Sequence, residues 1–292
     1  MVPDTDDIGL LVAGSTGHVV AVMCRGGCRG GRLHARRLLA VLESTVALRY
    51  VTPLREGGSL PGLVEAEDFG TYVVKFRGAG QGPKVLVAEV IVGELARRLG
   101  IAVPELKTIE VDEAIGRREP DPEVRDLLVG SAGPNLAIDF LPGAVGYDGI
   151  SFAPDRALAA RILWLDAFVA NVDRSWRNTN LLVWHGRMWA IDHGAALYFH
   201  HAWTTPDRFA AQPYDSHDHV LAAYAAGVAQ ADAELAPRIN ERLLEEVVAL
   251  VPDVWLASDT VHGSVAATRS AYLDFLRARA AHRGAWLPEP AR

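Results

Sequence analysis

The stretch NVDRSWRNTNLLVWHGRMWAIDHGAA, residues 171–196, decides how the rest of the chain is interpreted. Two short apolar segments within it, LLVW (181–184) and MWAI (188–191), flank HGR, where Gly186 permits the tight turn of an antiparallel hairpin. In such a hairpin the start of the first strand lies beside the end of the second strand. The loop before the first strand and the carboxylate of Asp192 are therefore expected at the same end of the hairpin.

Four polar side chains converge at that end: Asp173, Asn178, Asn180 and Asp192. Carboxylates and carboxamides are the hard oxygen ligands that Mg²⁺ prefers, and a small number of them leaves room for phosphate oxygens. Phosphoryl transfer needs a carboxylate to accept the proton of the attacking hydroxyl, a carboxamide and a second carboxylate for the metal, and a lysine for the phosphates. The first three groups are present, so the segment predicts a nucleotide site.

Lys75 is the expected lysine, in the predicted strand YVVKF (72–76). The amphipathic helix predicted over residues 85–99 offers two glutamates as its partner. Glu94 has arginines at i+3 and i+4, so a surface ion pair explains it. Glu89 has no base at those positions, so its carboxylate needs a cation from elsewhere, and Lys75 is the nearest candidate.

Strand-like segments dominate residues 46 to 115. LVEAE (63–67) and TYVVKF (71–76) predict a hairpin, and LKTIEV and NLAIDFL (135–141) predict further strands. Gly100 is the expected end of the helix that follows the hairpin.

A glycine-rich segment, REGGSLPG (55–62), precedes the first strand of that hairpin. Its glycines would let backbone N–H groups approach a phosphate, although a plain linker is an equally good explanation. Gly57, Gly58 and Ser59 are therefore candidate nucleotide-binding residues.

A boundary between two lobes is predicted near residues 142–150, where PGAVGYDG is typical of a linker. Beyond it, Asp155 opens a helix that is apolar nearly all round, as expected of a helix buried in a helical lobe. The predicted fold class is α+β, with a weakly ordered extension (1–44), a β-rich N-lobe (45–145) and a helical C-lobe (146–292).

The order of these motifs resembles the HipA-type kinases and their relatives the phosphatidylinositol kinases. YVVKF, a helix carrying Glu89, a hinge-like strand ending in FLPGA, NVDRSWRN and IDHG follow one another as in that family. Asp173 and Asn178 keep the five-residue step of the kinase catalytic loop H-R-D-x-x-x-x-N, and IDHG is similar to the metal-binding D-F-G. The resemblance covers about residues 46–205 and implies a two-lobed, protein-kinase-like fold.

The resemblance also implies a function, a serine/threonine-type transfer of phosphate from ATP with Mg²⁺ to a hydroxyl acceptor whose identity stays open. Asp173 would be the base, and Asn178 and Asp192 would hold the metal. Lys75, oriented by Glu89, would bind the phosphates. The adenine edge would be formed by Asp139, Phe140 and Leu141.

Two departures from the family pattern motivate a second hypothesis, a nucleotide-binding pseudokinase. Asn171 and Val172 stand where the protein kinases carry histidine and arginine, and His193 replaces the phenylalanine of D-F-G. Asn180 directly precedes the strand and therefore remains a rival to Asn178 as metal ligand.

Histidines after the hairpin motivate a third hypothesis, a metal-dependent phosphohydrolase. The candidate cluster comprises His200, His201, His217, Asp218 and His219. No helical i, i+4 spacing organises these residues, which favours a solvated polar loop instead.

Each candidate residue has a simpler explanation when it is taken alone. Lys75 could be an edge-strand lysine, and Asp192 could cap a helix. Trp164, Trp176, Trp184 and Trp189 are expected in core and hairpin packing. The joint order and spacing of the motifs favours the kinase-like interpretation.

Composition narrows the possible partners and compartment. Half of the 292 residues are apolar and the formal net charge is −7, which argues against a broad surface for nucleic acid. No apolar stretch approaches the length of a membrane span. Cys24 and Cys28 are too few for a disulfide framework, so we expect a cytoplasmic protein.

Overall fold

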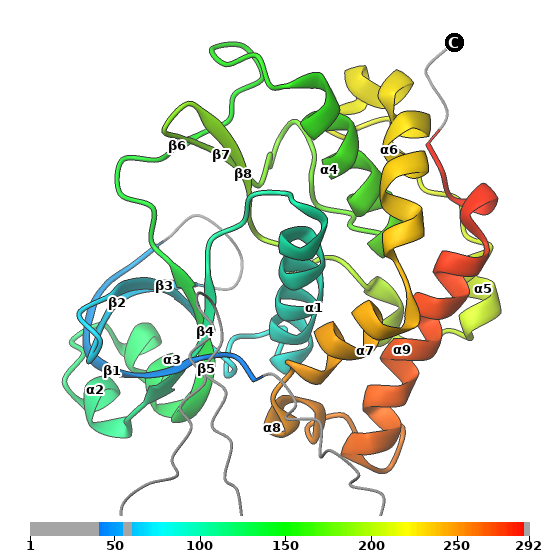
Figure 1. The fold of residues 1–292 in the computed structure, drawn as a ribbon. Coiled ribbons are helices and arrows are strands. Elements are labelled where there is room, and N and C mark those ends of the chain that lie inside the picture. The colour runs from blue at the N-terminus through cyan, green and yellow to red at the C-terminus, as the bar shows by residue number, and fades with distance from the viewer. Residues whose placement is uncertain (1–40, 55–59, 289–292) are drawn as a thin grey trace, which may run out of the picture. The chain divides into compact units, whose positions relative to one another are not determined.

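The structure is a computed structural model that describes residues 41–54 and 60–288 (Figure 1). The described residues all belong to one compact unit. The predicted extension lies outside the described residues as far as residue 40, and so do Gly57, Gly58 and Ser59.

Five strands form a closed barrel in the N-terminal part, in the order β1, β2, β3, β5, β4. They are β1 (Ser44–Pro53), β2 (Gly62–Ala66), β3 (Thr71–Lys75), β4 (Leu106–Val111) and β5 (Gly133–Asp139). Parallel pairing of β1 with β4 closes the barrel, and the other pairs are antiparallel, including the predicted β2–β3 hairpin. Strand alternation sends Val74 into the barrel core and Lys75 to the opposite face.

Two short helices, α2 (Glu113–Arg117) and α3 (Pro122–Gly130), connect β4 to β5 beside the barrel (Figure 1). Val124 and Leu128 of α3 belong to the barrel core, because their apolar side chains repeat at the four-residue spacing of one helix face.

Helix α1 (Pro83–Leu99) follows the β2–β3 hairpin, as predicted, and begins two residues earlier than expected. Gly100 ends it in the left-handed conformation at φ 83°, which glycine adopts without steric cost. Its apolar side chains pack in the main core together with Leu136 and Ile138 of β5 and with helix α4. The helix therefore joins the barrel to the helical part.

The C-terminal part is helical and is built around α4 (Arg156–Val169), as predicted. The Asp155 carboxylate accepts the N–H of Leu158 at 2.8 Å and caps this helix. The other helices and 3₁₀ turns are η1 (Tyr198–His201), α5 (Pro206–Ala210), η2 (Ala222–Gly227), α6 (Val228–Leu235), η3 (Ala236–Arg238), α7 (Glu241–Ala249), α8 (Asp253–Leu256), α9 (Val265–Ala281) and η4 (Arg283–Ala285).

The predicted hairpin of the key segment is present between α4 and η1. Strands β7 (Leu181–Trp184) and β8 (Arg187–Ala190) pair antiparallel, and β6 (Val145–Gly146) adds a third short strand. The second strand begins and ends one residue earlier than predicted. A β-rich N-terminal part and a helical C-terminal part confirm the predicted α+β class. Within residues 41–54 and 60–288, no helix combines the length and apolar character needed to cross a bilayer.

Candidate active site

Lys75 lies on an interior strand, since β3 pairs with β2 on one side and β5 on the other. Its residue is 5% exposed, and its ammonium donates to Oε1 of Glu89 and, at 2.7 Å, to Oδ1 of Asp192. An edge-strand lysine is therefore the wrong explanation. The barrel, α1 and the segment after β8 each contribute one ionisable side chain to this cluster.

The charges of the cluster follow from burial and contact. Burial acts to lower the pKa of Lys75, but the charges of Glu89 and Asp192 outweigh it and raise that pKa. Burial acts to raise the pKa of Asp192, but the charge of Lys75 outweighs it and holds that pKa below its usual range. Burial raises the pKa of Glu89, whose side chain is 1% exposed. One ammonium thus serves two carboxyl groups, and the more accessible of them, Asp192, is ionised.

Gly194 brings the chain after Asp192 directly against α1. A Cβ at this position would lie 2.5 Å from Cγ1 of Val85 and 3.3 Å from Oε1 of Glu89. A side chain at residue 194 would therefore push the first turns of α1 away, so this close approach requires glycine.

The loop before β7 forms a second cluster around Asp173. Nδ2 of Asn178 donates to Oδ2 of Asp173 at 2.9 Å, and Nδ2 of Asn180 donates to the backbone carbonyl of Asp173, also at 2.9 Å. Asn180 is buried, whereas Asn178 is exposed. Asn180 and Asp192 both adopt positive φ, 47° and 51°, a conformation that Asn and Asp tolerate better than other side chains.

Arg174 connects the two clusters. Its guanidinium donates to the backbone carbonyls of Asn180 and Ile191, which end the loop and the hairpin, and the N–H of Ile191 donates to Asn180 O at 3.1 Å. The loop that carries Asp173 is thereby held beside the residue that precedes Asp192. The structure therefore brings the start of the first strand and the end of the second strand together, as expected of the hairpin, with Asn178 and Asn180 in contact with Asp173 and Asp192 in contact with Lys75.

Asp166 of α4 anchors Arg174, and it lies outside the motifs recognised in the sequence. Its carboxylate accepts from Arg174 Nε at 2.5 Å, from Asn171 Nδ2 at 2.8 Å and contacts Nε2 of His219 at 3.1 Å. Burial acts to raise the pKa of Asp166, but the charge of Arg174 and the contact with His219 hold it well below its usual range. The available signal was that Asp166 is the one acid of α4 and lies in its apolar second half, because a buried carboxylate needs a partner.

The sequence model of the HipA-like kinases matches residues 49–282, most of the chain. The chain belongs to the HipA-like kinase family. No curated protein matches its sequence.

One solved kinase structure shares the fold, and two others are more distantly similar. The Helicobacter pylori proinflammatory kinase CtkA is similar with a TM-score of 0.53 at 12% identity, covering 83% of this chain and 95% of its own. Two structures of the Golgi casein kinase, one with Mn/ADP bound, each give a TM-score of 0.41 at 12% and 11% identity. They cover 82% and 84% of this chain and 73% and 74% of their own. The similarity to CtkA, together with the family match, confirms the kinase-like fold class.

His193, which the resemblance aligns with the phenylalanine of D-F-G, is buried. Burial, and then the nearby charge of Arg174, lower its pKa to about 3, so the ring is neutral. Arg174 lies 3.2 Å from Nδ1, which makes Nδ1 the acceptor and assigns the ring hydrogen to Nε2. Nε2 is buried without a hydrogen-bond partner among the described residues.

The histidines proposed as a metal cluster separate into three places. His200 and His201 contact each other at 3.2 Å, His217 is exposed beside Asp218, and His219 contacts Asp166. In the part of the chain that the structure describes, no group of three or more such side chains could hold a metal ion. The residues are neither a metal site nor a uniformly solvated loop, because His200 and His219 are buried.

Glu94 and Trp176 lie in environments that differ from those predicted. Glu94 pairs with Arg97 at 3.0 Å as predicted, but its residue is buried rather than on the surface. Trp176 is exposed, with the Arg177 guanidinium 4.2 Å from its ring centroid, so it takes no part in the core.

The predicted adenine edge comprises Asp139, the last residue of β5, and the two residues that follow it. The N–H of Asp139 donates to Glu105 O and that of Phe140 to Thr71 O, whereas the N–H of Leu141 has no backbone acceptor among the described residues. Burial, and then the charge of Glu105, raise the pKa of Asp139. Asp139 and Leu141 also line a hollow of about 410 Å³ that Lys75, Asp173 and Asp192 do not reach.

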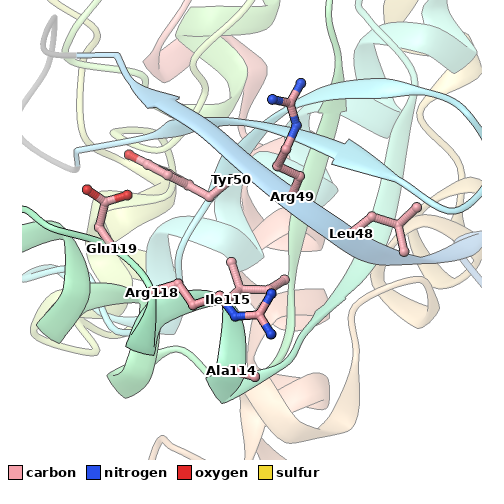
Figure 2. A pocket seen from close by; sticks show the side chains of 7 residues that line it. All are labelled: Leu48, Arg49, Tyr50, Ala114, Ile115, Arg118 and Glu119. Atoms are coloured by element: carbon pink, nitrogen blue, oxygen red, sulfur yellow. The ribbon is translucent and has the colours of Figure 1, made fainter.

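Another hollow, of about 230 Å³, lies on the outer wall of the barrel between β1 and α2 (Figure 2). None of the candidate site residues lines it. Its lining residues are Leu48, Arg49, Tyr50, Ala114, Ile115, Arg118 and Glu119.

Proposed function

We propose that this HipA-like kinase transfers the γ-phosphate of ATP to a hydroxyl group of an acceptor, with Asp173 as the base. The supporting observation is the buried cluster in which one ammonium, that of Lys75, contacts both Glu89 and Asp192. A buried lysine held by two carboxyl groups has a fixed position, and it is next to an ionised carboxylate that suits a divalent cation.

The donor set fits Mg²⁺. Asp192 supplies an ionised oxygen, and its side chain is 43% exposed, so the carboxylate is accessible. Asn178 is exposed, and no described residue donates to its carboxamide oxygen. The side chain of Asn180 is buried whereas that of Asn178 is exposed, which favours Asn178 as the second ligand. When bound, Mg²⁺ would neutralise charge on the phosphate oxygens.

Asp173 suits the base because it is half-buried and oriented. The amide of Asn178 holds Oδ2, and the Asn180 amide holds the backbone. In the proposed reaction the acceptor oxygen bonds to the γ-phosphorus as the bond from that phosphorus to the β-phosphate oxygen breaks and ADP leaves. The acceptor proton passes to the Asp173 carboxylate.

The nucleotide would be held at three places. Lys75 would bind the phosphates, and the N–H of Leu141 would donate to adenine beside Asp139 and Phe140. Gly57, Gly58 and Ser59 would cover the phosphates, a proposal that rests on sequence because these residues lie outside the described part of the chain.

The test combines binding and transfer. Thermal shifts of the full chain with ATP, with and without Mg²⁺, measure binding, and radiolabelled ATP measures transfer to the protein or to an added acceptor. Asp173→Asn is expected to lower transfer by at least about 100-fold, the usual contribution of a general base, while ATP·Mg still shifts the melting temperature. Asp207→Asn, on the exposed start of α5, is the matched control and should transfer at the wild-type rate.

Three outcomes would count against the proposal. Wild-type transfer by Asp173→Asn would show that another group is the base. Binding of ATP·Mg by the wild type without transfer to itself, protein or lipid would favour the pseudokinase, which the missing histidine before Asp173 and the presence of His193 motivate. Bound zinc, manganese or iron in the purified protein would favour the phosphohydrolase.

A further inference from the structure

Lys84 of α1 connects that helix to the helical part of the protein. Its ammonium lies 2.9 Å from Oδ2 of Asp259 and donates to the backbone carbonyl of His200 at 2.5 Å. It also lies 5.5 Å from the ring centroid of Trp203. None of these contacts involves the residues assigned to catalysis.

A lysine at this position is unfavourable for the helix itself. Lys84 lies in the first turn of α1, where the helix dipole disfavours positive charge, and α1 has no acidic residue in that turn. Gly82 precedes the helix with no side-chain cap. Five other helices, α2, α3, α4, α7 and α9, begin with a side chain that accepts a first-turn N–H: Asp112, Asp121, Asp155, Asn240 and Ser264. A residue that breaks a local preference points to a role set by the tertiary structure.

The partners of Lys84 belong to a packed network rather than to an open surface. Asp259 lies between α8 and α9, its side chain is 5% exposed, and it also accepts Trp203 Nε1 at 2.6 Å. His200 belongs to η1, the turn that follows the Asp192–Gly194 segment, and its buried ring contacts Tyr272 Oη of α9 at 3.0 Å. This network gives the buried His200 a structural role.

The position of α1 matters because its first turns reach the active-site cluster. Val85, the residue after Lys84, would clash with any side chain at Gly194. Glu89 follows five residues after Lys84, about 7.5 Å along the helix axis. A shift of the first turn of α1 would therefore move the carboxylate that orients Lys75.

We infer that Lys84 is a positioning residue, which fixes the N-terminal end of α1 against Asp259 and His200 so that Glu89 meets Lys75. This inference rests on the proposed function, since its consequence is for phosphate transfer. Lys84 touches neither ATP nor the acceptor in this role, and it acts through α1.

The test replaces Lys84 and measures both turnover and helix order. Lys84→Met keeps the apolar stem and removes the charge, Lys84→Arg restores the charge, and Asp259→Asn removes the partner. Lys107→Met is the matched control, because Lys107 is another partly buried lysine, paired with Asp68 at 3.0 Å on the barrel. ATP turnover with Mg²⁺ gives kcat and KM, and hydrogen exchange of residues 83–92 reports on α1 directly.

Lys84→Met is expected to lower kcat by about tenfold or more with KM for ATP within about threefold, because misplacement of a catalytic group mainly affects the reacting complex. Exchange in residues 83–92 should become about tenfold faster. Lys84→Arg should recover most of kcat, and the double variant with Asp259→Asn should lose little more than either single variant. Lys107→Met should leave kcat and exchange in α1 unchanged.

Wild-type kcat in Lys84→Met, or unchanged exchange in α1 of that variant, would overturn the inference. An equal loss in Lys107→Met would do so as well, because it would indicate general destabilisation. If the wild type turns over no ATP, the proposed function fails, and exchange then decides the inference alone. Faster exchange in Lys84→Met but not in Lys107→Met would support the positioning role of Lys84 even in that case.

Discussion

Asp166→Asn removes the negative charge that neutralises Arg174 inside the protein. Asparagine has nearly the same shape, but its NH₂ group would face a donor of Arg174 or Asn171, because the Asp166 carboxylate accepts from both. The Arg174 side chain has no exposed surface, so water cannot replace the lost acceptor. The substitution therefore tests whether the buried pair holds the loop that carries Asp173.

The expected loss of stability follows from the burial of both partners. Removing one partner of a buried ion pair costs about 3–5 kcal/mol, because the other charge is left uncompensated. That is a large part of a total stability of about 5–15 kcal/mol. With a urea slope of about 3 kcal/mol per M for a chain of this size, the unfolding midpoint should fall by about 1–1.7 M.

Urea unfolding followed by tryptophan fluorescence and by circular dichroism measures this shift. Asp155→Asn is the control, because it makes the same substitution at the exposed start of the same helix, where asparagine caps as well as aspartate. Its midpoint should stay within about 0.2 M of the wild type. If Asp166→Asn unfolds at the same urea concentration as Asp155→Asn, the buried pair does not stabilise the fold, and the reasoning is wrong.

Two further predictions concern acid stability and the approach of α1. The folded-state pKa of Asp166 is held below its usual range, so its stabilisation is complete above the unfolded pKa of about 3.9 and is lost as pH falls below that value. The urea midpoint of the wild type should therefore fall more steeply between pH 5 and pH 3 than that of Asp166→Asn, and parallel slopes would contradict this. Gly194→Ala places a Cβ 2.5 Å from Val85, and we expect about 10- to 100-fold lower transfer from the displaced α1, with Gly80→Ala, which has open space, unchanged. Wild-type transfer by Gly194→Ala would show that the close approach is unimportant.

Local sequence patterns were sufficient to predict much of the fold. The β2–β3 and β7–β8 hairpins, the apolar stripe of α1 with its stop at Gly100, and the cap of α4 at Asp155 all depend on residues close in sequence. Turn, cap and periodicity signals report such contacts directly. The pairing of Lys75 with Glu89 was also inferable, because Glu89 has no base on its own helix face.

Several features of the candidate site could not be predicted in this way. Asp166 contacts His219 across 53 positions of the chain, and Lys84 contacts Asp259 from another element altogether. The histidines that looked like one cluster lie in different environments for the same reason. Spacing in sequence says nothing about distance once helices pack against one another.

The amino-acid sequence alone specifies which side chains are available for the proposed phosphate transfer and the order in which they occur. Charge type, strand alternation and helix period are properties of neighbouring residues, so they can be identified without knowledge of packing. Packing in three dimensions sets which charges are buried, which carboxyl group remains ionised and which residues hold the loop of Asp173 and α1 in place. Those properties depend on desolvation and on contacts between distant segments, and both exist only after the chain has packed.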